Sequence, residues 1–107
     1  MKQIGRLAMP WVYILKCSDD SYYVGLAQQD LDRRIGEHQS GAYPGYTSKR
    51  RPVALVWADE YERYDQAIAL ERQLKGWSRV KKEALIAGDF DRLQTLSKRR
   101  GGQTDKD

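Results

Sequence analysis

Arg34 and His38 are residue types that can hold a charge or move a proton, and their spacing places both on a helix face that should be apolar. A guanidinium is permanently charged, and an imidazole takes up or releases a proton near neutral pH. Residues three and four apart lie on one side of a helix, so both side chains share a stripe with Leu31 and Ile35. The pattern predicts a polar site on the inner face of this helix.

Glu71 is a third polar residue in an apolar context. The helix predicted around it has an apolar stripe formed by Ala67, Leu70, Leu74 and Trp77. Glu71 lies at the edge of that stripe. Burying a carboxylate is costly unless a cation or a hydrogen-bond donor compensates it. Glu71 therefore predicts a partner, for which the candidates are a metal ion, Arg34, or water in a cleft.

A purely structural interpretation accounts for the same residues. Arg34 and Glu71 would form an ion pair between two helices, and His38 would be a core histidine bonded to a backbone carbonyl. Cys17 is expected to be a small buried apolar residue. Three tyrosines, each taken singly, are more typical of half-buried core residues than of catalysts; they are Tyr13, Tyr23 and Tyr46.

The surrounding residues predict the order strand, strand, helix, strand, helix, helix, with one more short helix at the end. Residues 11–17 and 22–26 are rich in aromatic and β-branched residues and flank a turn at 18–21, which predicts a hairpin. A third strand is expected at 53–58. Helices are expected after the capping residues Asp30, Asp65, Ser78 and Asp89. This order favours a small antiparallel or mixed sheet covered by helices.

Length and composition limit the possibilities further. A chain of 107 residues with 19 Lys and Arg against 15 Asp and Glu forms one domain with a weak preference for polyanions. One cysteine and one histidine exclude an internal disulfide, a multi-cysteine zinc site and a histidine-rich metal cage. No membrane span or signal peptide is evident, so a cytoplasmic protein is expected. Residues 1–10 are expected to be a lead-in, 11–97 one domain, and 98–107 a disordered tail.

Several short motifs, taken in order, resemble the GIY-YIG endonuclease family, specifically its small single-domain bacterial members. Val12-Tyr13-Ile14 and Tyr23-Val24-Gly25 are similar to the paired signature of that family. Residues 30–38 resemble its first helix, and residues 69–82 resemble its glutamate helix and the segment that follows. The resemblance spans about Trp11 to Ile86. It implies an α/β (α+β) fold in which helices flank a three-stranded antiparallel sheet.

The resemblance also implies roles for individual residues. Tyr13 and Tyr23 match the signature tyrosines, with Tyr13 as the general base and Tyr23 orienting it or the water. Arg34 matches the catalytic arginine, His38 the accompanying histidine, and Glu71 the ligand of a divalent metal ion, Mg²⁺ or another such as Mn²⁺.

The sequence departs from the family pattern at three points. Trp11 stands in place of the first signature glycine, and the chain contains no asparagine to fill the late position that many of the nucleases use. One extra residue lies between Gly25 and Asp30, so strict counting would select Arg33 as the catalytic arginine. The register of residues 30–34 and the helix face both favour Arg34.

The function implied is a metal-dependent endonuclease that hydrolyses DNA phosphodiester bonds with structural or weak sequence selectivity. Basic side chains are then expected to contact nucleic-acid phosphates along the rim of the site; they are Arg33, Lys49, Arg50, Arg51, Lys75, Arg79, Lys81 and Lys82. The alternative is a catalytically silent nucleic-acid-binding module that retains the fold. A protein-interaction adaptor has less support, because the sequence shows no heptad repeat or large apolar patch.

Overall fold

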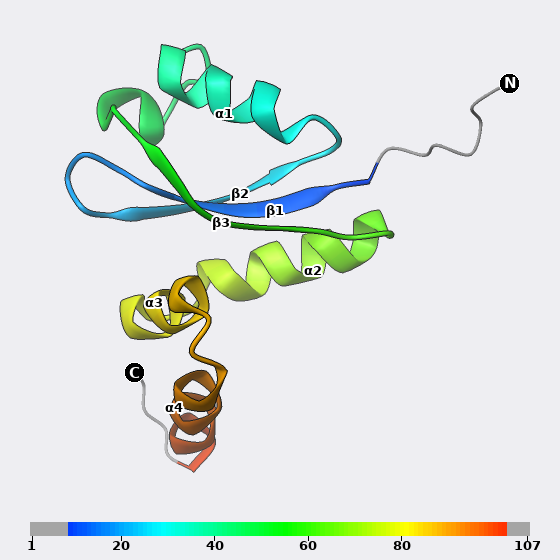
Figure 1. Ribbon diagram of the computed structural model, residues 1–107, viewed down its shortest axis with the longest axis vertical. Helices are drawn as coiled ribbons and strands as arrows, with labels where there is room; N and C mark the ends of the chain where they lie inside the picture. The colour runs from blue at the N-terminus through cyan, green and yellow to red at the C-terminus, as the bar shows by residue number, and fades with distance from the viewer. Residues whose placement is uncertain (1–8, 103–107) are drawn as a thin grey trace, which may run out of the picture. The chain divides into compact units, whose positions relative to one another are not determined.

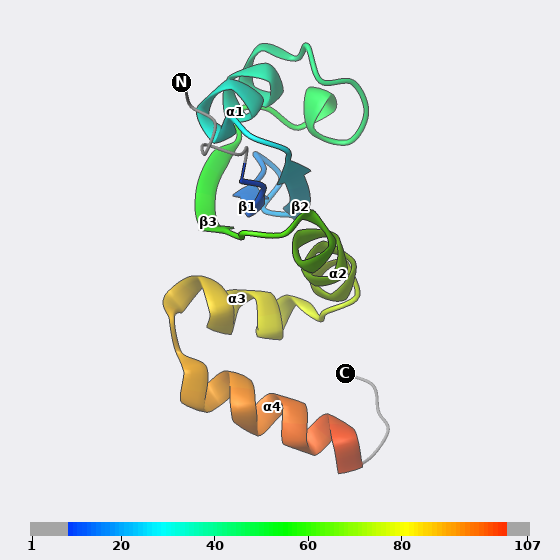
Figure 2. The ribbon, with the colours of Figure 1, turned by 90° about the vertical axis from the view of Figure 1, so that its right-hand side faces the viewer.

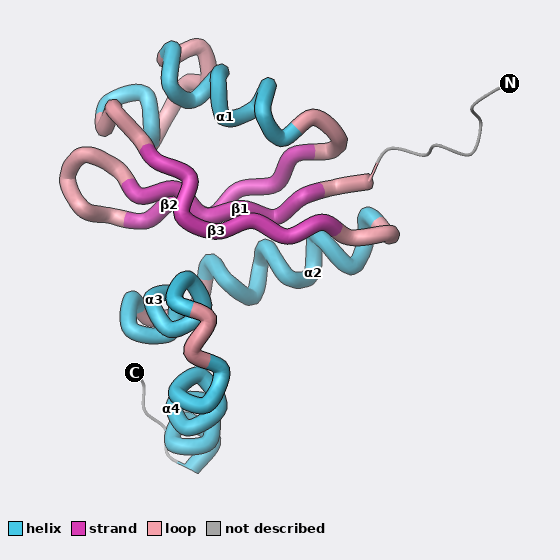
Figure 3. Tube along the Cα trace, viewed as in Figure 1, coloured by secondary structure: helices cyan, strands magenta, loops and turns pink. Residues whose placement is uncertain are grey.

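The computed structural model describes residues 9–102, and its helices and strands follow the predicted order (Figure 1). The strands are β1 (Trp11–Lys16), β2 (Tyr22–Ala27) and β3 (Ala54–Glu60). The helices are α1 (Leu31–Ser40), the single 3₁₀ turn η1 (Thr47–Lys49), α2 (Tyr64–Lys75), α3 (Arg79–Ala87) and α4 (Phe90–Gly102). Figure 3 shows how the loops join them. The predicted fold class, a three-stranded antiparallel sheet with flanking helices, is confirmed.

The sheet is built around β1, which lies between β2 and β3 and is antiparallel to both. Helix α1 covers one face of the sheet, and α2 packs on the other side against β2 and β1 (Figure 2). A central strand with both faces covered buries the side chains of its middle residues, and Val12, Tyr13, Ile14 and Leu15 are all fully buried. Tyr13 lies opposite Gly25 on β2 and Ala58 on β3, which places it in the middle of the sheet.

Helix α1 begins and ends where its capping residues predict. The side chain of Asp30 accepts a hydrogen bond from the backbone N–H of Arg33 at 3.1 Å. Gly41 ends the helix with φ of 84°, a left-handed conformation that favours glycine. These two ends fix the rotation of α1 over the sheet, which decides which of its side chains face Tyr13.

The other predicted caps agree with the structure in two cases out of three. Ser78 accepts from the N–H of Lys81, and Asp89 accepts from the N–H of Arg92. The prediction for Asp65 is wrong, because α2 already begins at Tyr64. Asp65 instead lies in the first turn, where its carboxylate pairs with Arg63 at 2.7 Å.

The chain ends differ in part from expectation. Helix α4 continues to Gly102, past residue 98, where the sequence predicted the disordered tail to begin. Residues 98–100 contain no helix breaker before Gly101, so nothing in the sequence stops the helix there. In the lead-in, the carbonyl of Pro10 accepts from the N–H of Tyr61 at 2.9 Å and extends the contact between β1 and β3. Residues 1–8 and 103–107 lie outside the described residues.

The chain divides into two compact units between Lys75 and Gly76. The first contains the sheet, α1 and α2, and the second contains α3 packed against α4. The candidate site described below lies entirely in the first unit. Within residues 9–102, no helix has the length and apolarity needed to cross a membrane.

Candidate active site

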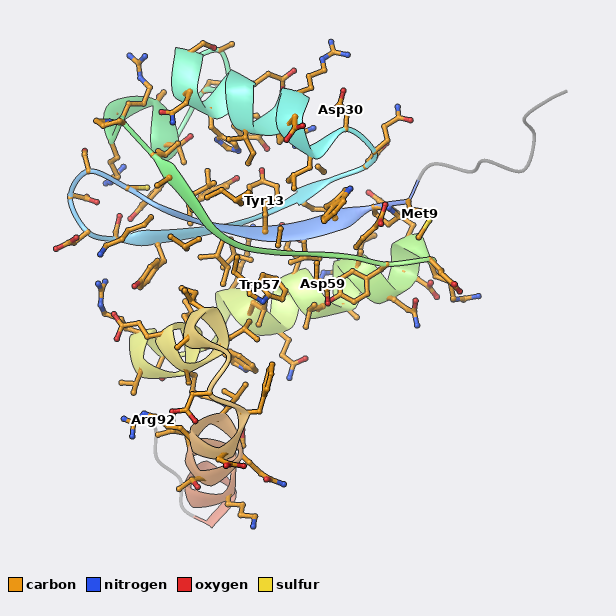
Figure 4. All side chains as sticks on the ribbon, viewed as in Figure 1. Met9, Tyr13, Asp30, Trp57, Asp59 and Arg92 are labelled. Carbon is orange, nitrogen blue, oxygen red and sulfur yellow. The ribbon has the colours of Figure 1, made fainter. Side chains whose placement is uncertain are left out.

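The phenol of Tyr13 lies at the centre of the site, on the face of the sheet that α1 covers. Figure 4 shows its side chain rising from β1 toward α1, with Asp30 at the start of that helix. The ring crosses directly over Gly25 on the neighbouring strand. A Cβ at position 25 would overlap the Tyr13 hydroxyl and Cζ and would lie 2.7 Å from Cε1. Gly25 is therefore needed because the ring occupies the space of a side chain.

A chain of three buried side chains runs from Tyr13 through the imidazole of His38 to a threonine. The Tyr13 hydroxyl lies 2.7 Å from His38 Nε2, and His38 Nδ1 lies 2.7 Å from the hydroxyl of Thr47. Tyr13 and His38 are fully buried, and Thr47 is 1% exposed. His38 thus lies on the inner face of α1 as predicted. Its partners are two side chains, whereas the structural interpretation assigned it a backbone carbonyl.

The environment of His38 keeps the imidazole neutral. Burial lowers its pKa, the positive charge of Arg34 lowers it further, and the carboxylate of Glu37 opposes both effects. Because the ordinary pKa of histidine is about 6.5, His38 is unprotonated at pH 7 and one ring nitrogen is free to accept a proton.

Arg34 lies beside Tyr13 and remains partly open to solvent. Its guanidinium donates to the carbonyl of Leu26 at 2.9 Å and pairs with Glu37 at 3.2 Å, and its proximity to the Tyr13 hydroxyl lowers the pKa of that phenol. Its side chain is 28% exposed, compared with 76% for the neighbouring Arg33. Of the two arginines, the structure brings Arg34 to Tyr13 and leaves Arg33 on the surface.

The phenol of Tyr13 is held in its protonated form. Burial raises its pKa well above the ordinary value, while the hydrogen bond and the charge of Arg34 counteract part of this rise. The pKa of Tyr23 is also raised, first by burial and then by a hydrogen bond with Tyr43. Neither tyrosine therefore carries a charge at neutral pH in the free protein.

The aromatic rings of Tyr43 and Tyr23 pack against His38. The Tyr43 ring lies 4.4 Å from the His38 ring and 5.0 Å from the Arg34 guanidinium carbon. The Tyr23 ring lies 5.2 Å from the His38 ring and stacks on Tyr46 at 6.0 Å. These rings limit the access of water to the buried pair.

Glu71 is mostly buried, as its helix position predicts, and its partner is local. Its side chain is 18% exposed, and its carboxylate pairs with Lys75 one turn later on α2 at 3.2 Å. Since Arg34 pairs with Glu37 instead, the predicted structural ion pair between Arg34 and Glu71 does not form. The negative charge of Glu71 raises the pKa of both Tyr13 and Tyr23, so the carboxylate lies within electrostatic reach of both phenols.

A cleft of about 920 Å³ opens beside this group of residues. Its wall includes both Arg33 and Arg34, together with Glu37, Leu31 and Trp11. Arg34 therefore lies close enough to the buried Tyr13 to lower its pKa and also lines an open cleft. An anion that enters the cleft can reach the guanidinium without unfolding any element.

The candidate metal ligand is a single carboxylate. Among residues 9–102, no group of three or more His, Cys, Asp and Glu side chains could hold a metal ion. Mg²⁺ accepts one or two carboxylates and completes its octahedral shell with waters and substrate phosphate oxygens. Glu71 fits that requirement, and a bound ion would have to displace the ammonium of Lys75.

The other basic residues predicted to bind nucleic acid differ widely in their surroundings. Lys49 is exposed, whereas Arg50 pairs with Asp19 at 3.0 Å and lies over the Tyr46 ring at 3.8 Å. Arg51 donates to the carbonyls of Ser48 and Gln39. Arg50 and Arg51 thus fix the loop that carries Thr47.

The remaining basic candidates lie in the second unit, apart from the half-exposed Lys75. Arg79 is half-exposed and pairs with Glu83. Lys81 is only 5% exposed, with its ammonium 4.7 Å from the centre of the Trp77 ring, which does not suit a surface phosphate contact. Lys82 is half-buried, and burial together with the charge of Arg79 lowers its pKa.

Sequence reasoning did not identify Thr47, Tyr43 or Glu37 as parts of the site. The pairing of Glu37 with Arg34 could have been predicted, because Glu37 lies three residues after Arg34 on the same helix. Tyr43 lies in the loop after α1, and Thr47 begins the 3₁₀ turn η1 that follows this loop. No periodic pattern applies to this segment. Only the path of that loop over the sheet brings them to His38.

The close contact between Gly25 and Tyr13 leads to a first prediction. Gly25→Ala should lower the free energy of unfolding by about 1–3 kcal/mol, the usual cost of overpacking a core, because the Tyr13 ring cannot move without losing its bond to His38. Chemical denaturation measures the change. Gly36→Ala is the control: nothing lies within 4 Å of a Cβ there, and alanine should raise the stability of α1 by about 0.5–1 kcal/mol. Equal effects of the two changes would contradict the packing described.

The chain is similar to several known proteins over most of its length. A protein from Staphylococcus aureus strain N315, UPF0213 protein SA0446, is 43% identical over 76 residues, which cover 71% of this chain and 92% of that protein. The solution NMR structure of UPF0213 protein BH0048 from Bacillus halodurans matches with a TM-score of 0.50 and 40% identity, over 74% of this chain and 83% of the other. The solution NMR structure of protein EF2693 from E. faecalis matches with a TM-score of 0.51 and 28% identity, over 92% of this chain and 94% of the other.

The family assignment rests on the region that contains the site. The sequence model described as the GIY-YIG catalytic domain matches residues 9–84. This range includes the paired tyrosine motifs, Arg34, His38 and Glu71. The chain therefore belongs to the GIY-YIG family.

Proposed function

We propose that this protein is a divalent-metal-dependent endonuclease that hydrolyses DNA phosphodiester bonds, selecting DNA by structure or with weak sequence preference. The observation that carries the proposal is Arg34, which lines an open cleft and lies beside a buried phenol that is hydrogen-bonded to a neutral histidine. A fixed cation beside a group that can move a proton is the combination that phosphoryl transfer to water requires.

Arg34 is proposed to bind the non-bridging oxygens of the scissile phosphate. Its position is fixed by the Leu26 carbonyl and by Glu37 before any substrate arrives. A preorganised donor stabilises the charge that develops in the transition state without the cost of reorganisation. The fork of a guanidinium also matches two phosphate oxygens at once.

Tyr13 and His38 are proposed to remove the proton of the attacking water. The water oxygen bonds to phosphorus and its proton passes to the Tyr13 oxygen, while the Tyr13 proton passes to His38 Nε2. The bond from phosphorus to the leaving oxygen breaks, and that oxygen takes its electron pair and then a proton from solvent. Because the Tyr13 phenol is fully buried in the protein without substrate, the neighbouring Tyr23 and Tyr43 rings must shift when substrate binds.

Glu71 is proposed to hold the metal ion together with the phosphate. A bound Mg²⁺ would polarise the phosphate and stabilise the leaving oxygen. The carboxylate is already mostly shielded from solvent and is paired to a cation that can move, since the Lys75 side chain is 52% exposed. With one protein ligand, metal affinity should depend on bound nucleic acid.

Cleavage of end-labelled DNA in Mg²⁺ and in chelator tests the proposal, with single-stranded, duplex and branched substrates. Glu71→Gln should reduce Mg²⁺-dependent cleavage by at least about 100-fold, because metal stabilisation amounts to several kcal/mol and each 1.4 kcal/mol is tenfold. Binding of DNA in chelator should be unchanged. Salt-sensitive binding with no cleavage of any substrate would instead identify a silent binding module.

Two control variants separate the metal ligand from other effects of the change. Lys75→Gln breaks the same ion pair but keeps the carboxylate, so cleavage should remain dependent on Mg²⁺. Glu62→Gln removes an exposed carboxylate just before α2 and should leave the rate unchanged. If Glu71→Gln cleaves as fast as Glu62→Gln, Glu71 does not hold the metal.

A further inference from the structure

Thr47 lies where it can determine which nitrogen of His38 carries the proton. It is 1% exposed, and its hydroxyl lies 2.7 Å from Nδ1 of a histidine that is itself fully buried. A neutral imidazole has one N–H donor and one acceptor nitrogen. The partner of either nitrogen therefore sets the state of both.

The contacts of Tyr13 decide between the two possible tautomers. Among the described residues, the hydrogen bond that the structure gives the Tyr13 hydroxyl is the one with His38 Nε2, at 2.7 Å. The nearby Arg34 guanidinium only donates, so it offers no acceptor for the Tyr13 proton. If Nε2 carried the proton, the buried Tyr13 O–H would have no acceptor among the described residues, at a cost of about 1–3 kcal/mol.

We infer that Thr47 is a positioning residue: it accepts a hydrogen bond from His38 Nδ1–H and so holds Nε2 unprotonated toward Tyr13. The inference rests on the proposed function only for its kinetic consequence, because the tautomer itself is a property of the free protein. When Nε2 takes the Tyr13 proton, the imidazolium keeps the same Nδ1–H donor and the same acceptor. Thr47 therefore accepts the hydrogen bond from His38 Nδ1–H both before and after the transfer, and it adds no charge to the site.

The loop around Thr47 is fixed in a way that suits this role. Thr47 begins the 3₁₀ turn η1, and the Arg50 N–H donates to its carbonyl at 2.9 Å. The Arg50 side chain donates to Asp19 and to the Tyr46 carbonyl, and the Arg50 carbonyl accepts from the N–H of Ser18. These contacts tie the loop to the β1–β2 turn. Arg50 thus holds the loop, and the phosphate contact expected from the sequence stays a prediction.

His38 is the only histidine in the chain, so the tautomer can be measured directly. A long-range ¹H–¹⁵N correlation spectrum of the untagged, ¹⁵N-labelled protein at pH 7.5 distinguishes a protonated ring nitrogen from an unprotonated one. We expect protonated Nδ1 and unprotonated Nε2 in the wild type. Thr47→Val keeps the shape but removes the hydroxyl, and should shift the population toward Nε2–H. Thr47→Ser should restore the wild-type spectrum.

The control is Thr95→Val, at an exposed position on α4, which should not change the His38 signals. A wild type with Nε2–H, or a Thr47→Val spectrum identical to the wild type, would overturn the inference. If Thr47→Val does not fold, the wild-type spectrum alone still decides the tautomer. Thr47→Ser then shows whether a hydroxyl without the methyl group maintains it.

The kinetic arm tests the consequence for catalysis separately. If the proposed function holds, Thr47→Val should lower kcat by about 10- to 100-fold, the range known for groups that orient a ligating histidine, with KM unchanged. Rescue of kcat by Thr47→Ser is expected, whereas a loss in KM alone would overturn the positioning role. A wild type that cleaves no DNA would refute the proposed function, and the NMR result would still decide the tautomer.

Discussion

Tyr13→Phe is expected to lower kcat for DNA cleavage by about 10²- to 10⁴-fold, the contribution typical of general acid–base catalysis. The change removes one oxygen and leaves a ring of the same shape over Gly25. That oxygen is the atom through which the proton of the attacking water is proposed to reach His38. Single-turnover cleavage in Mg²⁺ measures the effect without interference from product release.

Tyr64→Phe is the matched control for the loss of a hydroxyl. Its side chain is 46% exposed at the start of α2, and its oxygen contacts Gln28 at 3.4 Å. This variant should cleave at the wild-type rate. If Tyr13→Phe does the same while remaining folded, Tyr13 is not the base and the proton path through His38 is wrong.

Arg34→Ala is expected to lower kcat by about 10²- to 10³-fold, the cost of removing one preorganised donor from a developing negative charge. Affinity for DNA should fall much less, because other basic side chains also contribute to the salt-dependent part of binding. Cleavage at saturating DNA measures the first effect, and a binding titration in chelator measures the second.

Arg33→Ala gives a closely matched comparison. Both arginines lie on α1 and both pair with Glu37, at 3.5 Å for Arg33 and 3.2 Å for Arg34. Only Arg34 reaches the Leu26 carbonyl and Tyr13. Arg33→Ala should therefore keep kcat near the wild-type value. The opposite ranking would support the strict count along the sequence, which selects Arg33.

Much of the site could be predicted from periodicity because it lies on regular elements. Arg34 and His38 share the inner face of α1 since residues four apart stack on a helix, and the capping residue Asp30 fixes where that helix begins. The burial of Glu71 follows from the same reasoning. The pairing of Glu71 with Lys75, which lies four residues later on α2, could have been predicted from the same spacing but was not among the candidates considered.

The contacts that no periodic pattern could predict are those made by loops. Thr47 reaches His38 only because the loop after α1 turns back over the sheet, and contacts with Asp19 and Ser18 of the hairpin turn hold it there. Such contacts join residues about thirty positions apart and follow no repeating pattern. The same limitation applies to the ion pair of Arg50 with Asp19, which joins two loops and follows no sequence pattern.

The most direct test of the central claim is anomalous diffraction from Mn²⁺ in crystals of the protein with a non-cleavable phosphorothioate oligonucleotide. If Arg34 and Glu71 act on one phosphate, a single Mn²⁺ peak will lie on the Glu71 carboxylate and on a phosphate oxygen. Another oxygen of that phosphate will contact the Arg34 guanidinium. A phosphate bound away from Arg34, or Mn²⁺ bound elsewhere with Glu71 still paired to Lys75, would contradict the claim.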